Sequence, residues 1–265
     1  MVKIPSSYDI VGSKEKAVAI VEIPEDLQKK ENEITNQILA RHKNVKSILK
    51  KVSERKGIYR ITEYKLLLGD PNTEVIHKEY YCNFKLDPKL VYFSPREGTE
   101  RLRIATKVKP KETVMLMFAG IGVYAITITK KQPEVDKIIS IEINPIAYEY
   151  MKENIRLNKA TEKIIPILGD VKVKCKDWYG KCDRIIMPLP HDAWKFLNIA
   201  YKCLKLRGVI HLYIIEKEKN IDKKVKTIIN KFSKKIKRKL KYNIKKVLPY
   251  APRTYKYCID VELYH

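Results

Sequence analysis

Glycine, proline and cysteine are scarce in this chain of 265 residues, with 9, 13 and 5 copies. Because apolar residues make up 45% of the chain, this scarcity excludes a collagen-like, mucin-like or wholly disordered protein. The cysteines are odd in number, scattered and without a CxxC pair, so neither a disulfide framework nor a zinc ribbon is supported and no metal site is expected. Their pattern fits the reducing cytoplasm, which is the compartment that we expect.

Long apolar runs are also absent. The start, Met1-Val-Lys-Ile-Pro5, has no apolar signal core. The longest apolar stretch, residues 114–129, is shorter than the roughly 20 residues that a membrane span requires, and it contains two glycines. The sequence therefore predicts a soluble protein with no membrane partner.

Acidic residues are too few to balance the basic ones. Lys and Arg total 55 against 31 Asp and Glu, for a formal net charge of +24. Such an excess favours a polyanionic partner, nucleic acid first, although a lysine-rich proteome or a hot habitat would raise the charge without that function. The densest run, Lys234-Lys-Ile-Lys-Arg-Lys-Leu-Lys241, is suited to RNA phosphates, and a solvated charged helix is the alternative.

The patterns divide the chain into two parts. Residues 1–107 predict a small α+β accessory domain, with an extended run at 17–23, an amphipathic helix at 25–43 and strands or turns at 45–52, 57–68 and 74–84.

Residues 108–265 alternate short apolar strands with amphipathic helices, which predicts a doubly wound α/β sheet covered on both faces. The chain closes on two strands, expected to form an antiparallel pair at the sheet edge. We expect strands at 113–117, 137–142, 164–168, 184–187, 208–215, 244–248 and 255–264, and helices at 123–131, 145–158, 192–204 and 221–232.

A glycine turn follows the first of these strands, in Phe118-Ala-Gly-Ile-Gly122. The absence of Cβ at Gly120 and Gly122 lets a ligand approach the backbone, and a tight turn without a ligand is the alternative. The third glycine of a dinucleotide fingerprint is missing, which disfavours a pyrophosphate.

Acids follow the next two strands. Glu142 stands about 20 residues after the glycine turn, where a carboxylate can accept ribose hydroxyls. Asp170 ends the third strand, where it can accept an adenine amino group, and Met187-Pro-Leu-Pro190 ends the fourth. Each acid alone is equally well explained as a solvated carboxylate or a helix cap, but four strand ends in register favour a ligand site.

These motifs resemble those of the class I S-adenosylmethionine methyltransferases, over about residues 109–265. The resemblance implies a Rossmann-like fold and S-adenosylmethionine as the cofactor. One position departs from the pattern, since Leu116 stands where most members have an acidic residue. The residues that the resemblance implies for cofactor binding are Arg101, Phe118, Gly120, Gly122, Glu142, Ile143, Asn144, Asp170, Val171 and Pro188.

The segment before the sheet narrows the resemblance. Tyr92-Phe-Ser-Pro-Arg-Glu-Gly-Thr-Glu-Arg-Leu-Arg-Ile104 resembles the signature of the archaeal and eukaryotic tRNA methyltransferases that modify N1 of guanosine 37 in the anticodon loop. Further matches are Ser7-Tyr-Asp-Ile-Val-Gly12, Gly57-Ile-Tyr-Arg60, Asn154-Ile-Arg-Leu-Asn158, Lys163-Ile-Ile-Pro-Ile-Leu-Gly-Asp-Val171 and Tyr250-Ala-Pro-Arg253.

The family resemblance also implies a partner. Archaeal relatives often carry an additional N-terminal domain that touches the tRNA body, and this chain is expected to start after it. Recognition is therefore expected to depend on the anticodon arm, with tRNA-Phe as the expected substrate. A monomer without an obligate protein partner is expected.

The implied chemistry needs a base and a donor. Guanine N1 carries a proton at neutral pH, so a base must remove it and a donor must stabilise the charge that spreads to O6. By resemblance, Glu100 is the catalytic base and Arg60 the donor. On the residues alone, an ion pair of Glu100 with Arg96, Arg101 or Arg103 is favoured over the role of base, and only the family resemblance reverses this preference. For Arg60 the alternative is a surface strand residue.

Substrate contacts are implied for a further group of residues. Arg96 and Arg101 would shape the pocket, and Arg253 would bind the substrate, with a structural ion pair or a phosphate contact as its alternatives. His191 is interpreted as a loop histidine with partners of its own. The implied substrate-binding residues are Tyr92, Arg96, Pro188, Leu189, Pro190 and Arg253.

Pro188 departs from the Asn-Leu-Pro or Asn-Pro-Pro motif that is usual in guanosine-37 methylases. This resembles an archaeal subgroup of the wyosine pathway whose members also methylate C7 of the tricyclic 4-demethylwyosine. We hypothesise that Pro188 leaves room for this larger base; the alternative is a neutral substitution with guanosine as the sole substrate.

Two other functions stay open. One is the aminocarboxypropyl transferase of the same pathway, against which Arg96 and Glu100 argue because that family tends to have a shorter, glycine-bearing signature. The other is a non-catalytic RNA-binding module with a relic cofactor fold, suggested by Leu116 and Pro188.

Overall fold

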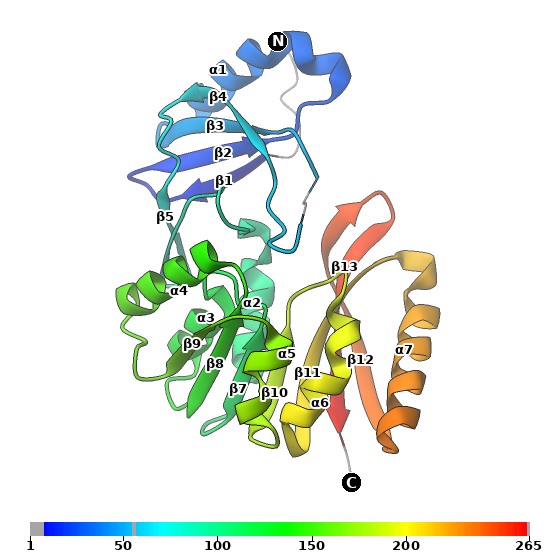
Figure 1. Ribbon diagram of the computed structural model, residues 1–265. Helices are drawn as coiled ribbons and strands as arrows, with labels where there is room; N and C mark the ends of the chain where they lie inside the picture. Colours follow the sequence, from blue (N-terminus) through cyan, green and yellow to red (C-terminus); the bar gives the residue numbers. More distant parts are fainter. Residues whose placement is uncertain (1–7, 55–56, 264–265) are drawn as a thin grey trace.

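The computed structural model describes residues 8–54 and 57–263. Ser7 of the first matched motif and Tyr264 at the end of the last expected strand lie outside them. A small N-terminal sheet stands above one edge of a larger sheet, and the hairpin of the last two strands reaches up beside it (Figure 1).

The N-terminal sheet has the order β1-β2-β3-β4, from β1 (Tyr8–Gly12), β2 (Ala17–Val21), β3 (Val45–Lys51) and β4 (Tyr64–Gly69). Strands β2 and β3 are parallel, so the chain between them must cross over, and it does so through helix α1 (Glu31–Arg41). Ile34 and Ile38 of α1 pack on the sheet. The single helix expected at 25–43 is wrong in its first part: Glu25–Lys30 form a 3-10 helix (η1) with no buried residue to hold an α-helix there.

A second hairpin, β5 (Val75–Glu79) and β6 (Cys82–Leu86), is held to helix α4 (Pro145–Leu157) by two asparagines. The Asn154 amide accepts from the Lys85 N–H (2.7 Å) and donates to its carbonyl (3.0 Å). Asn158 does the same with Asn83, at 2.9 and 2.6 Å. The two amides thus replace a third strand along the free edge of β6.

Helix α2 (Gly98–Lys107), preceded by the 3-10 turn η2 (Pro95–Glu97), packs against helix α3 (Val123–Lys131). No helix was expected at α2. Both α2 and the hairpin precede residue 108 and pack on helices of the larger sheet; the division at 107/108 stays a prediction.

The larger sheet has the order β12-β13-β11-β10-β7-β8-β9. Its strands are β7 (Thr113–Met117), β8 (Lys137–Glu142), β9 (Ile164–Leu168), β10 (Cys182–Met187), β11 (Leu204–Lys217), β12 (Leu240–Ala251) and β13 (Thr254–Leu263). The five from β7 to β11 are parallel, and β13 runs antiparallel to both β11 and β12. The expected doubly wound sheet with an antiparallel edge is confirmed.

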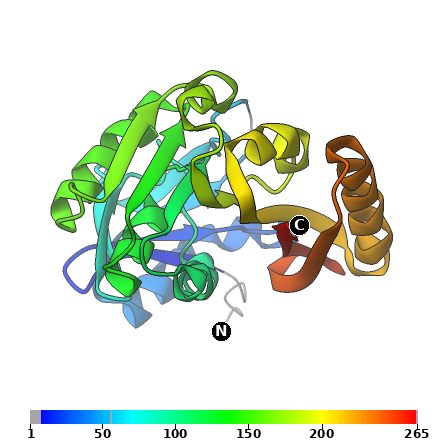
Figure 2. The ribbon, with the colours of Figure 1, turned by 90° about the horizontal axis from the view of Figure 1, so that it is seen from below.

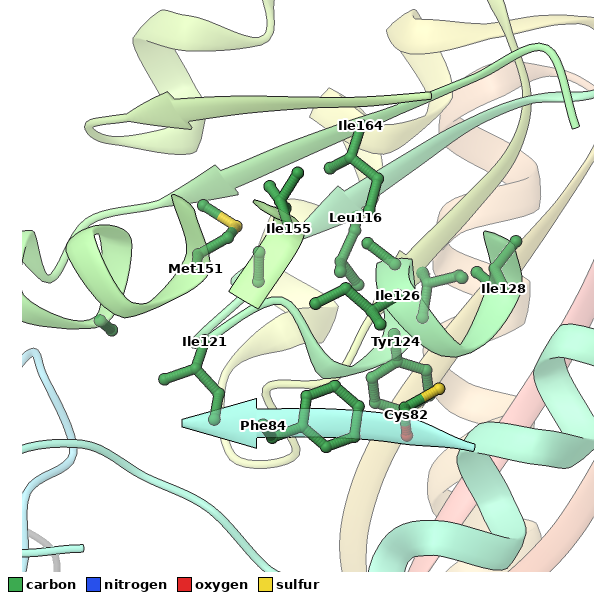
Figure 3. Packing of buried hydrophobic residues seen from close by; sticks show 14 of the residues in the cluster. Cys82, Phe84, Leu116, Ile121, Tyr124, Ile126, Ile128, Met151, Ile155 and Ile164 are labelled. Carbon is green, nitrogen blue, oxygen red and sulfur yellow. The ribbon is translucent and has the colours of Figure 1, made fainter. Parts of the chain in front are cut away.

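Alternating side chains of the central strand β7 face two cores. Leu116 packs with α2, α3 and α4, and Figure 3 shows it among Ile126, Ile155 and Ile164, with Cys82 and Phe84 of β6 on the far side of Tyr124. Met115 and Met117 face the other core, under α5 (Val171–Lys174), α6 (Leu197–Cys203) and α7 (Ile221–Ile236). Leu116 therefore packs inside the first core.

The remaining helical turns are η3 (Lys176–Trp178), η4 (Ala193–Phe196) and η5 (Glu218–Asn220). Helix α7 lies along the outer strands β12 and β13, at the edge of the molecule (Figure 2).

All five cysteines are buried free thiols. In the part of the chain that the structure describes, no helix is long and apolar enough to cross a membrane.

Candidate active site

The glycine turn after β7 needs backbone conformations that favour glycine. Gly120 and Gly122 have positive φ angles of 56° and 86°, and Phe118 has one of 63°. A Cβ at Gly122 would lie 3.0 Å from Cγ of Met151, whereas a Cβ at Gly120 would meet no atom within 4 Å. Gly122 is therefore fixed by packing, and Gly120 borders open space.

Glu142 at the end of β8 is the anchor of this turn. Its carboxylate is buried and accepts the N–H of Gly120 (2.7 Å) with one oxygen and the N–H of Asn144 (2.8 Å) with the other. Burial raises the pKa of Glu142, and these backbone N–H groups oppose that rise. A carboxylate has about four acceptor sites, and these contacts do not use all of them, so the oriented carboxylate can still accept a hydroxyl group.

The residues after β8 and β9 also cap helices. The side-chain oxygen of Asn144 accepts the N–H of Ile146 (3.0 Å) at the start of α4, and Asp170 accepts the N–H of Lys172 (2.8 Å) at the start of α5. The helix-cap alternative therefore applies to Asp170, and it leaves the second carboxylate oxygen of Asp170 available. Ile143 and Val171 follow the same two strand ends, with Val171 buried.

These groups meet at one edge because the carboxyl ends of parallel strands share it. The open space at Gly120 and the oriented carboxylate of Glu142 fit an adenosine-containing cofactor such as S-adenosylmethionine. The loop 118–122 would hold it through the backbone, with Glu142 on the ribose and Asp170 on the base.

Arg101 is almost fully buried and joins α2 to β5. It donates to both carboxylate oxygens of Glu79 (2.7 and 2.6 Å) and to the Ser94 carbonyl (3.1 Å), and it lies 5.3 Å from the centre of the Phe93 ring. These contacts satisfy the guanidinium within the protein. The predicted cofactor contact of Arg101 stays a prediction.

A cavity of about 670 Å³ lies between the N-terminal sheet and the loop after β10. Most of the predicted substrate residues line it together with the predicted donor: Arg60, Tyr92, Arg96, Pro188, Leu189 and Pro190. The structure thus brings residues from three distant segments of the chain to one cavity.

Arg60 reaches this cavity from the N-terminal part of the chain. It has a positive φ of 56°, and its guanidinium donates to a carboxylate oxygen of Asp192 at 2.6 Å. Asp192 also pairs with Lys195 (2.7 Å), which together with Arg60 keeps the pKa of Asp192 below its usual value. The ion pair holds Arg60 beside the Pro188–Pro190 loop, instead of on an open surface strand. Arg96 is held similarly by Asp9.

Glu100 is buried on α2 and does not line the cavity. Both of its oxygens accept from Arg103 (2.7 Å each), and one accepts the Tyr213 hydroxyl (2.6 Å). Of the two interpretations of Glu100, the ion pair with a nearby arginine is therefore present. Its role as base stays a prediction.

Two residues that line the cavity were not predicted as site residues from the sequence. Glu97 and Lys256 form a buried ion pair in the cavity wall, with 2.8 Å between Nζ and Oε2. Glu97 lies within the signature segment, three residues before Glu100, and this position could have identified it as a candidate site residue. Nothing in the sequence marked Lys256, one basic residue in a strand.

His191 lines the cavity, whereas Arg253 does not. Arg253 is exposed in the turn between β12 and β13 with φ of 53°, and its carbonyl accepts the Glu218 N–H at 2.9 Å. The ring of His191 packs edge-on against Tyr250 at 5.9 Å, which suits a loop histidine with its own partners.

Comparison with known protein families gives two matches that together span most of the chain. Residues 75–244 match the TRM5/TYW2 methyltransferase domain, and residues 1–73 match the TYW2 N-terminal domain.

Curated relatives carry related names. The chain is 40% identical to the tRNA (guanine(37)-N(1))-methyltransferase Trm5b of Pyrococcus abyssi, over 97% of this chain and 74% of that protein. It is 32% identical to the tRNA (guanine(37)-N(1))/4-demethylwyosine(37)-methyltransferase Taw22 of Nanoarchaeum equitans, over 97% and 99%. It is 38% identical to the tRNA(Phe) (4-demethylwyosine(37)-C(7)) aminocarboxypropyltransferase of Methanocaldococcus jannaschii, over 82% and 86%.

Solved structures of proteins with related names have a fold similar to that of this chain. The crystal structure of Trm5b from Pyrococcus abyssi has a TM-score of 0.86 at 38% identity, over 98% of this chain and 76% of that one. The complex of aTrm5 with tRNALeu has a TM-score of 0.84 at 36% identity, over 98% and 73%. TYW2 of M. jannaschii in complex with AdoMet has a TM-score of 0.74 at 31% identity, over 97% and 99%.

Proposed function

Because the chain belongs to the TRM5/TYW2 methyltransferase family, we propose that it transfers the methyl group of S-adenosylmethionine to N1 of guanosine 37 in tRNA. The observation that carries the proposal is the cavity that Arg60 shares with the Pro188–Pro190 loop. This loop follows β10, whose carboxyl end is at the same sheet edge as those of β8 and β9, where Glu142 and Asp170 stand. The name and the 97% coverage of the P. abyssi relative support the same reaction.

When bound, S-adenosylmethionine supplies an electrophilic methyl group on a sulfonium. In this chain Glu142 accepts the ribose hydroxyls, since its carboxylate is already oriented by two backbone N–H groups. The loop 118–122 approaches the cofactor through its backbone, and Asp170 accepts from the adenine amino group with its free oxygen.

Arg60 donates to O6 of the target guanine, where negative charge develops as N1 loses its proton. Its ion pair with Asp192 orients the guanidinium before the substrate arrives. By resemblance, Glu100 takes the N1 proton. To do so, Glu100 must exchange its contacts with Arg103 and Tyr213 for one with the base.

A second reaction, methylation of C7 of 4-demethylwyosine at the same position, is favoured by two observations. The N. equitans relative is named for both activities, and Pro188 lines the cavity with a compact apolar ring. We expect Pro188→Asn to lower the ratio of tricyclic to guanosine methylation. An unchanged ratio would overturn the role of Pro188.

The experiment uses tRNA-Phe with labelled S-adenosylmethionine, as the unmodified transcript and as tRNA that carries the tricyclic precursor at position 37. Mass spectrometry of the nucleosides identifies the modified atom. Methyl on guanosine N1 supports the first reaction, and methyl on both substrates supports the dual enzyme. An aminocarboxypropyl group instead of methyl would assign the activity named for the M. jannaschii relative, and no modification would contradict both.

The expected place of action is the cytoplasm. Five buried cysteines without a disulfide suit a reducing compartment.

A further inference from the structure

The cavity wall contains a buried ion pair to which no role is assigned. Glu97 lies on η2 and Lys256 on β13, and their side chains are only 6% and 4% exposed. The Tyr92 hydroxyl donates to the other oxygen of Glu97 at 2.7 Å. All three residues line the cavity of the proposed active site.

The register of strands β11 and β13 places the Glu97–Lys256 ion pair close to the Pro188–Pro190 loop. Lys256 is opposite Ile215 in the β11–β13 register. The N–H of Ile215 donates to the Pro190 carbonyl at 3.3 Å, and Ile215 also lines the cavity. One strand therefore separates Lys256 from the loop at which the substrate is expected.

Burying two charges costs desolvation energy, and a pair kept only for stability is often replaceable by apolar residues. This pair retains bonding capacity on the cavity side. A carboxylate has about four acceptor sites, of which Tyr92 and Lys256 use two.

The Lys256 ammonium has three N–H donors, and among the described residues its contacts are Glu97 and the face of the Tyr213 ring, at 4.9 Å. Lys256 also keeps the pKa of Glu97 below its usual value despite burial, so the carboxylate stays charged. The wall thus offers an acceptor and a donor side by side.

That combination matches the Watson–Crick edge of guanine, where the O6 acceptor adjoins the N1–H and N2–H donors. The neighbouring Pro188–Pro190 loop, which also lines the cavity, has no side-chain donor or acceptor. We propose that Glu97 and Lys256 recognise this edge, Glu97 accepting from the 2-amino group and Lys256 donating to the lone pair of O6 that Arg60 leaves open, so that N1 stays free for the reaction. The proposal rests on the proposed function and adds a specificity determinant to it.

The test compares kcat/KM on tRNA with guanosine or inosine at position 37, because inosine lacks only the 2-amino group. We expect the unaltered protein to favour guanosine by about tenfold or more, since a carboxylate left without its donor is costly. Glu97→Gln is expected to reduce that preference to about threefold or less, because the amide is a weaker acceptor.

Lys256→Met provides the second arm. Inosine retains O6, so this variant is expected to lower kcat/KM on both tRNAs by about tenfold. Because Lys256 also keeps Glu97 charged, the guanosine preference is expected to fall as well. This pattern also keeps the proposal testable should Glu97→Gln fail to fold.

Glu112→Gln is the matched control, since Glu112 forms a part-buried ion pair with Arg184 (2.7 Å) and does not line this cavity. It should leave the guanosine preference as it is. An undiminished preference in Glu97→Gln, or an unchanged kcat/KM on both tRNAs in Lys256→Met, would overturn the proposal while the proposed function stands. Methylation of neither tRNA by the unaltered protein would instead contradict the proposed function itself.

Discussion

His211 in β11 illustrates how single buried residues hold the two parts of the molecule together. Its Nδ1 lies 2.6 Å from Asp260 and its Nε2 lies 2.7 Å from Arg184. Arginine only donates, so Nε2 must accept and Nδ1 must carry the proton that goes to Asp260. Burial lowers the pKa of His211, which keeps the ring neutral. Arg103 and Lys107 from α2 also pair with Asp260, so α2 is fastened to β13 through this carboxylate.

We predict that Asp260→Asn destabilises the protein by about 3 kcal/mol at pH 7, because it removes the buried carboxylate that pairs with the part-buried Arg103 and accepts from His211. The pKa of Asp260 is held well below its usual 3.8 by His211 and Arg103, against the rise that burial causes. A lowered carboxyl pKa stabilises the folded state above pH 3.8, and this contribution is lost as the pH falls. Urea unfolding should therefore show a difference from the unaltered protein that shrinks below about pH 4.

Asp136→Asn is the control for this experiment, since Asp136 is exposed near the amino end of β8. Its free energy of unfolding should stay within about 0.5 kcal/mol of the unaltered protein. A loss in Asp260→Asn that persists undiminished at low pH would contradict the ion-pair explanation.

At the scale of elements, the central strands β7, β8 and β9 and helix α3 have the bounds that the sequence predicts. The apolar runs of β7, β8 and α3 are buried between charged segments, and hydrophobic periodicity detects that contrast. Helix α2 was missed for the opposite reason. Its buried side includes Glu100 and Arg101, which a periodicity argument counts as solvent-facing.

The candidate site was predictable to a similar extent. Glu142 and the glycine turn follow from strand ends and spacing, because parallel strands fix where such residues meet. The Glu97–Lys256 pair joins residues 159 positions apart through tertiary packing, and no local pattern encodes such a contact. The same holds for the contact of Glu100 with Tyr213.

The β5–β6 hairpin depends on two side chains of α4. We predict that Asn154→Ala costs about 2–4 kcal/mol, since it removes the partners of the Lys85 N–H and carbonyl at a part-buried position. Arg156→Ala, at an exposed site on the same helix, should change stability little. Urea unfolding with hydrogen exchange of the β6 amides checks both; retained protection at Lys85 would contradict the prediction.

At the scale of the whole molecule, the charge of +24 is concentrated partly on the outer edge. Helix α7 buries Ile221, Val225, Ile229 and Phe232 against the sheet. Many of its exposed residues, and of those in the turn that follows, are lysines. An amphipathic face explains why the helix forms, and it leaves the lysines available to phosphates.

We predict that replacing four exposed lysines there by glutamine weakens tRNA binding and lowers the slope of log Kd against log salt by about 3, because each phosphate contact contributes about 0.7–0.9. The four are Lys234, Lys235, Lys237 and Lys239. The control replaces four exposed lysines at the amino end of the large sheet: Lys109, Lys111, Lys131 and Lys137. Equal slopes in the two sets would favour a merely solvated helix.

Alkylation of the five buried cysteine thiols can show which parts of the folded protein unfold locally. Burial raises the pKa of Cys82 to about 11 and that of Cys182 to about 12, so the native state presents almost no thiolate to an alkylating reagent. Cys82 lies in the β5–β6 hairpin, Cys175, Cys182 and Cys203 in the core beneath α5 and α6, and Cys258 beside α2. The order in which these positions become alkylated would therefore rank the parts of the molecule by how often each one opens.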